Sequence, residues 1–159
     1  MKRDKPLTQQ QKWDEFSAAA KIVLVDFDGT LCEFSYPDMG PPMPGARQFM
    51  YKLLERELLP VIYTCRMSPM LYTVEQRAVA ADAIHAWCTE NDIPYHAIDS
   101  GENGKRLCLA SVDDHGVHAS RNNWDIVLWH IDKLSASEQV KQAERGQPPC
   151  DGQSASTQD

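Results

Sequence analysis

The chain has 159 residues, of which 42% are hydrophobic and 25% are charged, and its formal net charge is −7. The length fits one domain and the composition is that of a globular protein, which excludes a disordered or collagen-like chain. The acidic balance argues against a broad nucleic-acid surface without excluding a local basic site. No apolar run of about 18 residues predicts a membrane span, and no apolar segment typical of a signal peptide follows the charged start.

Five cysteines stand at positions 32, 65, 88, 108 and 150. Their number is odd and no two are spaced as C-x-x-C, which disfavours a disulfide framework or a structural zinc site. We interpret them as buried thiols in a reducing compartment, so a cytoplasmic protein is expected.

The first elements in chain order are a helix and a strand. Thr8 and Gln11 are spaced as a capping box, which predicts a helix over residues 8–20. The apolar, β-branched run at 22–26 predicts a strand that is buried on both faces, as in a parallel sheet.

An irregular loop is predicted next, over residues 31–44, because the segment is rich in proline and glycine. Pro44 is expected at the first turn of the following helix. The apolar face of that helix is formed by Phe49, Met50, Leu53, Leu54 and Leu58.

A second strand is predicted over residues 59–64, with Pro60 at its start. The helix after it opens either at Ser68 or, equally well, at Thr73 with Gln76 as a capping box. Its helically spaced apolar residues are Val74, Ala78, Ala81, Ile84 and Cys88.

Three more strands are predicted, over residues 95–98, 107–112 and 126–131. Strands that alternate with helices indicate an α/β fold with a mostly parallel sheet. From about residue 135 the composition becomes polar and lacks aromatic residues, which predicts a short frayed helix and then a disordered tail.

The stretch D-F-D-G-T-L directly after the first strand carries the chemistry. In a parallel sheet, functional groups gather beyond the carboxyl ends of the strands, where Asp26 and Asp28 lie. Two carboxylates this close repel each other unless a cation or a proton intervenes. Their oxygen atoms therefore indicate a site for a hard metal ion, for which we expect Mg²⁺.

Three further groups follow later in the chain. Asp113 and Asp114 close the strand at 107–112, so the two acidic pairs are expected to meet. Thr64 ends the second strand, and Arg66 after it has a guanidinium suited to phosphate. Lys105 supplies an ammonium that can neutralise both a carboxylate and a bound phosphate.

Each of these residues also has a simpler interpretation. Arg66 is equally able to cap a helix or to pair with an acid, Lys105 to be a solvated surface lysine, and Asp113 with Asp114 to be an acidic turn. A calcium loop at Asp26 and Asp28 is disfavoured, since a strand precedes them and the ligand spacing of an EF-hand does not follow.

D-F-D-G-T-L after I-V-L-V, a strand-ending Thr, a Lys and V-D-D, in this order, resemble the four motifs of the haloacid dehalogenase (HAD) superfamily over about residues 21–131. The resemblance implies a three-layer, Rossmann-like α/β fold. Residues 31–44 are too short for a cap domain and would form a small flap, so a capless member is expected. The predicted organisation is an N-terminal helical segment, a catalytic domain and a polar tail, at 1–20, 21–134 and 135–159.

The resemblance also implies roles for individual residues. Asp26 would be the nucleophile that forms an aspartyl-phosphate, and Asp28 the general acid and then the base. Thr64 and Lys105 would bind the phosphoryl group, with Arg66 as a further phosphate ligand. The ligands of Mg²⁺ would be Asp26, the backbone carbonyl of Asp28, Asp113 and, directly or through water, Asp114.

The implied activity is Mg²⁺-dependent hydrolysis of a phosphomonoester whose class the sequence does not name. A nucleotide or nucleic-acid-end phosphatase is the alternative within enzymes; nucleic acid is not favoured, because such an enzyme would need a basic track near the site. A non-catalytic, metal-binding interaction module on the same fold is the alternative of another class. A homo-oligomer, or a partner that supplies a lid, stays open.

Overall fold

The computed structural model describes residues 6–102, 106–116, 129, 131 and 133. The chain divides into two compact units, residues 1–114 and 115–159. Every helix and strand bounded below belongs to the first unit. None of the helices in the described ranges is long and apolar enough to cross a bilayer.

A four-stranded parallel sheet organises the first unit, with the strand order β3-β2-β1-β4. The strands are β1 (Ile22–Val25), β2 (Leu59–Ile62), β3 (Ala97–Ile98) and β4 (Ala110–Val112). The predicted α/β class with a parallel sheet is therefore confirmed. The two later strands are shorter than the apolar runs at 95–98 and 107–112 suggested, because an apolar run also includes residues that flank the paired segment.

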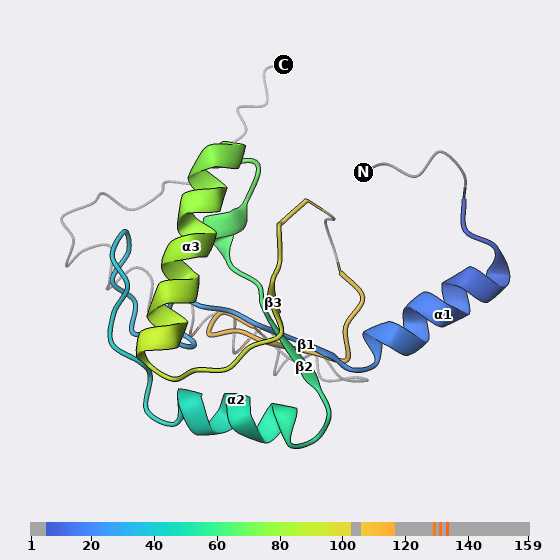
Figure 1. Cartoon of the computed structure of the whole chain (residues 1–159), viewed down its shortest axis with the longest axis horizontal. Helices are drawn as coiled ribbons and strands as arrows, with labels where there is room; N and C mark the ends of the chain where they lie inside the picture. The colour runs from blue at the N-terminus through green and yellow to red at the C-terminus, as the bar shows by residue number, and fades with distance from the viewer. Residues whose placement is uncertain (1–5, 103–105, 117–128, 130, 132, 134–159) are drawn as a thin grey trace, which may run out of the picture. The chain divides into compact units, whose positions relative to one another are not determined.

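Helices connect the parallel strands. Helix α1 (Gln9–Ala19) precedes β1, α2 (Ala46–Leu54) joins β1 to β2, and α3 (Val74–Glu90) joins β2 to β3 (Figure 1). A short 3₁₀ turn, η1 (Cys65–Met67), follows β2.

The core lies where α2 and α3 pack on the sheet. Its strand residues include Val23, Val25 and Ile62, and the helices add Met50, Leu53, Ile84, Trp87 and Cys88. Leu24 and Val61 are buried as well. Since side chains alternate along a strand, both faces of β1 and β2 are covered, as the continuous apolar runs predicted.

Capping residues set the starts of two helices. Thr8 forms a capping box with Gln11 at α1, as predicted. At α3 the box is made by Thr73 and Gln76, which decides between the two starts that the sequence left open. In each box a hydroxyl accepts from an N–H of the first turn that has no partner within the helix.

The start of α2 differs from its prediction. Pro44 does not lie in the first turn, because Ala46 begins the helix and Gly45 is its N-cap residue, at φ 86°. Glycine adopts this left-handed conformation without strain. The chain therefore turns into the helix at Gly45, one residue after the proline.

The loop at 31–44, which we call the flap, folds back on itself beside the end of β1. The backbone N–H of Glu33 donates to Pro41 at 2.9 Å, and that of Met43 to Leu31 at 2.9 Å. Trp87 of α3, a buried core residue, anchors the flap: its Nε1 donates to the carbonyl of Gly40 at 3.0 Å. The same indole packs edge-on against Phe27, with 5.0 Å between ring centroids.

The predicted strand at 126–131 is wrong at the residues that the structure describes there. Trp129 and Ile131 are helical, as is Lys133. A short apolar run has the same composition in a buried helix and in a buried strand, so its periodicity could not separate the two. The predicted tail at 135–159 lies outside the described residues.

We expect Trp87→Phe to lower the free energy of unfolding by about 1–3 kcal/mol, because it leaves the buried Gly40 carbonyl without its donor while keeping an aromatic ring. Urea unfolding followed by circular dichroism measures the change. Trp13→Phe, on the exposed side of α1, is the matched control and should have little effect. Equal stability of Trp87→Phe and the parent protein would contradict the anchoring role.

Candidate functional site

Three strand ends meet at one edge of the sheet. Val25 of β1 is in register with Ile62 of β2 and with Val112 of β4, so these strands end at the same level. Asp26 continues from β1, and its backbone N–H donates to the carbonyl of Val112 at 2.9 Å. The parallel register thus brings Asp26 beside Asp113. The predicted meeting of the two acidic pairs is realised by Asp26 alone, because Asp28 turns toward Arg66.

The carboxyl of Asp26 lies in an environment that disfavours its charge. Burial is the largest cause, and the nearby carboxylates of Asp113 and Asp114 add repulsion; together they raise the pKa of Asp26 from 3.8 to about 7. Hydrogen bonds from the Phe27 backbone and the Thr30 side chain partly oppose this rise. Such a carboxylate gains from a cation placed among the three acids.

Asp26, Asp113 and Asp114 form a cluster that we call the acidic corner. Thr30 and Gly29 shape it, and neither residue was predicted to belong to the site. The backbone N–H of Asp114 donates to the Thr30 hydroxyl at 3.0 Å, so Thr30 connects Asp114 with Asp26. Gly29 has φ 88°, and a Cβ built there would lie 2.3 Å from Oδ2 of Asp114. A side chain at position 29 would therefore displace Asp114. The G-T of the D-F-D-G-T-L motif is the part of the sequence from which these two roles could have been predicted.

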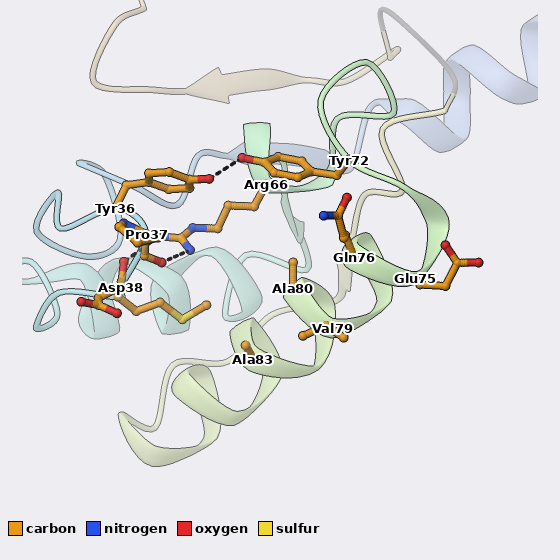
Figure 2. Close-up of a pocket in the computed structure, with 11 residues that line it drawn as sticks. Tyr36, Pro37, Asp38, Arg66, Tyr72, Glu75, Gln76, Val79, Ala80 and Ala83 are labelled. Carbon is orange, nitrogen blue, oxygen red and sulfur yellow. Dashed lines mark hydrogen bonds between the residues drawn. The ribbon is translucent and has the colours of Figure 1, made fainter.

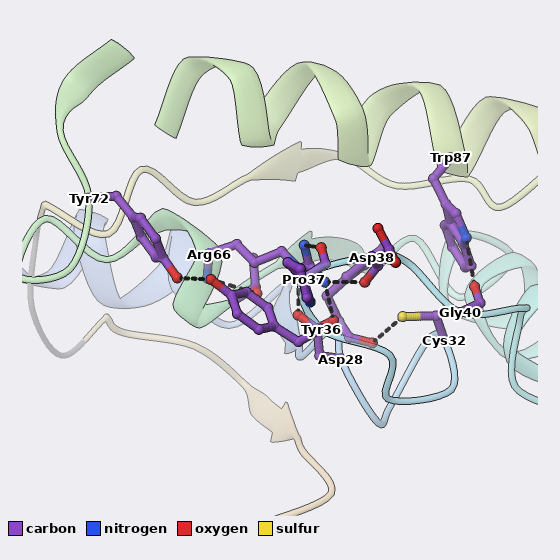
Figure 3. Close-up of polar contacts among 11 residues, drawn as sticks. Asp28, Cys32, Tyr36, Pro37, Asp38, Gly40, Arg66, Tyr72 and Trp87 are labelled. Atoms are coloured by element: carbon purple, nitrogen blue, oxygen red, sulfur yellow. Dashed lines mark hydrogen bonds and ion pairs between the residues drawn. The ribbon is translucent and has the colours of Figure 1, made fainter. Parts of the chain in front are cut away.

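Asp28 points to a different partner. Its carboxylate accepts two parallel hydrogen bonds from Arg66, Nε to Oδ2 and Nη2 to Oδ1, each at 2.7 Å (Figure 3). The Arg66 and Asp28 side chains are only 9% and 14% exposed. Bidentate geometry with little water makes this one of the strong kinds of ion pair.

Arg66 also fastens the flap. Its Nη1 donates to the carbonyl of Pro37 and its Nη2 to that of Asp38, both at 2.7 Å. The guanidinium carbon lies 5.0 Å from the Tyr36 ring centroid and 5.9 Å from that of Phe27. Of the roles weighed for Arg66, the structure shows the pairing with an acid; phosphate binding stays a prediction.

Thr64 and Lys105 complete the predicted set. Thr64 is buried at the end of β2, and its hydroxyl accepts from the backbone N–H of Arg66 at 3.2 Å, which caps η1. It thus positions Arg66, and its contact with a phosphoryl group stays a prediction. Lys105 lies outside the described residues.

A second polar cluster at the end of β3 was not predicted. Asp99 is 4% exposed, accepts from the N–H of Gly101 at 2.8 Å, and forms an ion pair with Arg106. Arg77 of α3 donates to the carbonyl of Ser100 at 2.8 Å. These residues form no recognisable motif in the sequence, so the cluster could not be predicted before the fold was known.

The donor chemistry of the acidic corner suits a hard cation. Within the described ranges, no three His, Cys, Asp or Glu side chains are grouped so that they could hold a metal ion. Mg²⁺ needs fewer protein ligands: it retains several waters and is usually bound by one or two carboxylates. Asp26 with Asp113, whose repulsion is relieved by a cation, is compatible with that requirement.

Comparisons with known proteins add a structural neighbour. No family model matches the chain, and no curated protein does. One solved structure, described as the structure of a conserved protein from Bacteroides thetaiotaomicron, has 21% sequence identity and a TM-score of 0.44 over 71% of this chain and 90% of that chain.

The carboxyl groups at the strand ends thus divide into two environments. Asp26 is half-buried among acids, where its negative charge is disfavoured, whereas Asp28 is neutralised by Arg66. The Asp28 hydrogen bonds raise the pKa of Arg66 above its ordinary value, so the guanidinium stays charged. Two neighbouring carboxyls in such different surroundings can take different chemical roles.

We expect Arg66→Met to lower the free energy of unfolding by about 3–5 kcal/mol, because it leaves the Asp28 carboxylate buried without its partner. Chemical denaturation measures this loss. Arg47→Met is the matched control: Arg47 pairs with Asp92 at the surface, where both side chains are more than half exposed, and its loss should change stability little. Equal effects of the two substitutions would contradict a buried, structural ion pair.

We expect Asp26→Asn to stabilise the metal-free protein at pH 8, by an amount of the order of 2 kcal/mol after allowance for partial exposure. The folded pKa of Asp26, about 7, lies above its ordinary value of 3.8, so the folded chain holds a proton that the unfolded chain has released. Stability of the parent therefore falls as pH rises from about 4 to 7, and the advantage of Asp26→Asn shrinks toward pH 4. Thermal unfolding in EDTA across this range tests the dependence, and a pH-independent difference would contradict it.

Proposed function

We propose that the protein is a Mg²⁺-dependent phosphomonoester hydrolase that acts through an aspartyl-phosphate. The observation that carries the proposal is the position of Asp26: a half-buried carboxyl at the end of β1, beside the acidic pair that ends β4. The order of the four sequence motifs supports the same activity, and the parallel sheet is compatible with a three-layer HAD-type fold.

The proposed reaction has two steps. A carboxylate oxygen of Asp26 attacks phosphorus, the bond from phosphorus to the ester oxygen breaks, and the leaving alcohol takes a proton from Asp28. Asp28 then removes a proton from water, whose oxygen attacks the aspartyl-phosphate. Inorganic phosphate leaves, Asp26 is regenerated as a carboxylate, and Asp28 is again protonated.

Mg²⁺ would be held by Asp26, the backbone carbonyl of Asp28 and Asp113, with Asp114 as a direct or water-mediated partner. When bound, it would offset the repulsion between an anionic nucleophile and an anionic substrate. Thr30 keeps the corner in place from the protein side, since it bonds to both Asp26 and Asp114. Thr64 and Lys105 are the proposed phosphoryl ligands.

The ion pair with Arg66 bears on the role of Asp28. A carboxylate has about four lone-pair positions, and Arg66 uses one on each oxygen. The ionised Asp28 of this ion pair is the form that acts as the base in the second step. As the acid of the first step, Asp28 must carry a proton at one of the lone-pair positions that Arg66 does not use. The same ion pair would serve equally well as a purely structural link. It is therefore also compatible with the second candidate function, a non-catalytic, metal-binding interaction module.

Phosphate release from a panel of phosphomonoesters tests the activity. The panel holds sugar phosphates, nucleotides, phosphopeptides and 3′-phosphorylated oligonucleotides, each assayed with Mg²⁺ and with EDTA. We expect Mg²⁺-dependent release that Asp26→Asn lowers by at least about 10³-fold, because the nucleophile is lost, and that Asp28→Asn lowers by about 10²–10⁴-fold through lost acid–base catalysis.

Asp14→Asn, on α1, is the matched control and should leave turnover unchanged. Preference for the oligonucleotide or a nucleotide would select the nucleic-acid-end alternative. Absence of release by folded, Mg²⁺-loaded protein, or equal rates in the parent and in Asp26→Asn, would overturn the proposed activity and favour the binding module.

A further inference from the structure

A cavity of about 710 Å³ lies between the flap and helix α3, with Arg66 in its wall (Figure 2). This volume is in the range of pockets that enclose a small organic molecule. It therefore provides room for far more of a substrate than its phosphate group.

The walls of the cavity are mostly carbon. Tyr36 from the flap and Tyr72, which precedes α3, form one side, and their hydroxyls hydrogen-bond to each other at 2.5 Å. The opposite side is made of small apolar residues of α3: Val79, Ala80 and Ala83. Val79 is 69% exposed, so this side of α3 presents apolar surface that a bound group could cover.

The charges around the cavity disfavour a substrate that carries another anionic group besides the phosphate to be cleaved. Arg66 is the cation among the described lining residues, and its guanidinium is already bonded to Asp28 and to two flap carbonyls. The acidic residues Asp38 and Glu75 also border the cavity. A sugar bisphosphate or a nucleoside diphosphate would place its additional charge beside these carboxylates, at a cost in binding.

The cavity adjoins the proposed catalytic groups through a single side chain. Arg66 lines the cavity with its stem and guanidinium, and the same guanidinium orients Asp28. Asp28 is not among the described lining residues, so a leaving group that takes a proton from Asp28 would reach the cavity along the Arg66 side chain.

We infer that the cavity binds the organic group of the substrate, and that this group is uncharged and aromatic. The inference rests on the proposed phosphatase function and names the substrate class: monoesters of an arylalkyl or aryl alcohol with no second phosphate. Flat rings suit a slot with tyrosines on one side and small aliphatic side chains on the other. Cleavage breaks the bond between phosphorus and the ester oxygen, and the alcohol leaves with the proton from Asp28.

The test compares benzyl phosphate with ethyl phosphate, whose leaving groups are both alkoxides, so that ring binding rather than leaving-group chemistry is measured. We expect kcat/KM for benzyl phosphate to be at least tenfold higher. Ala80→Phe, which fills the cavity, should raise KM for benzyl phosphate at least tenfold and change kcat/KM for ethyl phosphate less than threefold. Ala78→Phe, exposed on the same helix but outside the cavity, is the matched control and should change neither.

A second readout needs no turnover. Binding of 2-naphthol, followed by its own fluorescence, should be saturable in the parent protein and at least tenfold weaker in Ala80→Phe and in the smaller change Ala83→Leu. Naphthol binding without hydrolysis of any ester would retain the aromatic cavity and reject the phosphatase. Equal turnover of benzyl and ethyl phosphate, or a tenfold preference for a phosphoserine peptide, a 3′-phosphorylated oligonucleotide or a bisphosphate, would overturn the inference and retain the phosphatase.

Discussion

The ion pair between Arg66 and Asp28 connects the parts of this protein that matter for its chemistry. Four hydrogen bonds of 2.7 Å join the guanidinium to Asp28 and to two carbonyls of the flap. One side chain thus fixes a proposed catalytic carboxyl, the position of the flap and one wall of the cavity. Its burial is tolerable because nearly all of the charge is compensated by close, well-directed partners.

Asp26 and Asp28 are two residues apart and have opposite surroundings. Asp28 turns toward Arg66, whereas Asp26 faces Asp113 and Asp114 at the end of β4, where its charge is disfavoured. The structure therefore places an unstable negative charge next to a compensated one. Without a metal ion this difference runs opposite to the proposed roles, because a nucleophile must be ionised and a general acid must carry a proton. A cation at the acidic corner would stabilise the charge on Asp26 that its role as nucleophile requires.

Substrate selection would then depend on the flap and α3 together. Trp87 anchors the flap through Gly40, Arg66 anchors it through Pro37 and Asp38, and Tyr36 meets Tyr72 across the cavity. The flap is short, yet it is held at several points by side chains from elsewhere in the fold. Its position is therefore defined by contacts with η1 and α3 residues rather than by its own length.

Local patterns determined much of what could be predicted from the sequence. The apolar run at 22–26, the capping box at Thr8 and the D-F-D-G motif depend on neighbouring residues, so β1, the start of α1 and the acidic strand end were predictable. The start of α3 at Thr73 was one of two alternatives. The pairing of Arg66 with Asp28 was only one of several alternatives, and the cavity was not predicted at all. The helical state of Trp129 was predicted wrongly as strand. The ion pair and the cavity depend on contacts between residues distant in sequence, and only the tertiary structure decides which side chains satisfy one another's charges and hydrogen bonds.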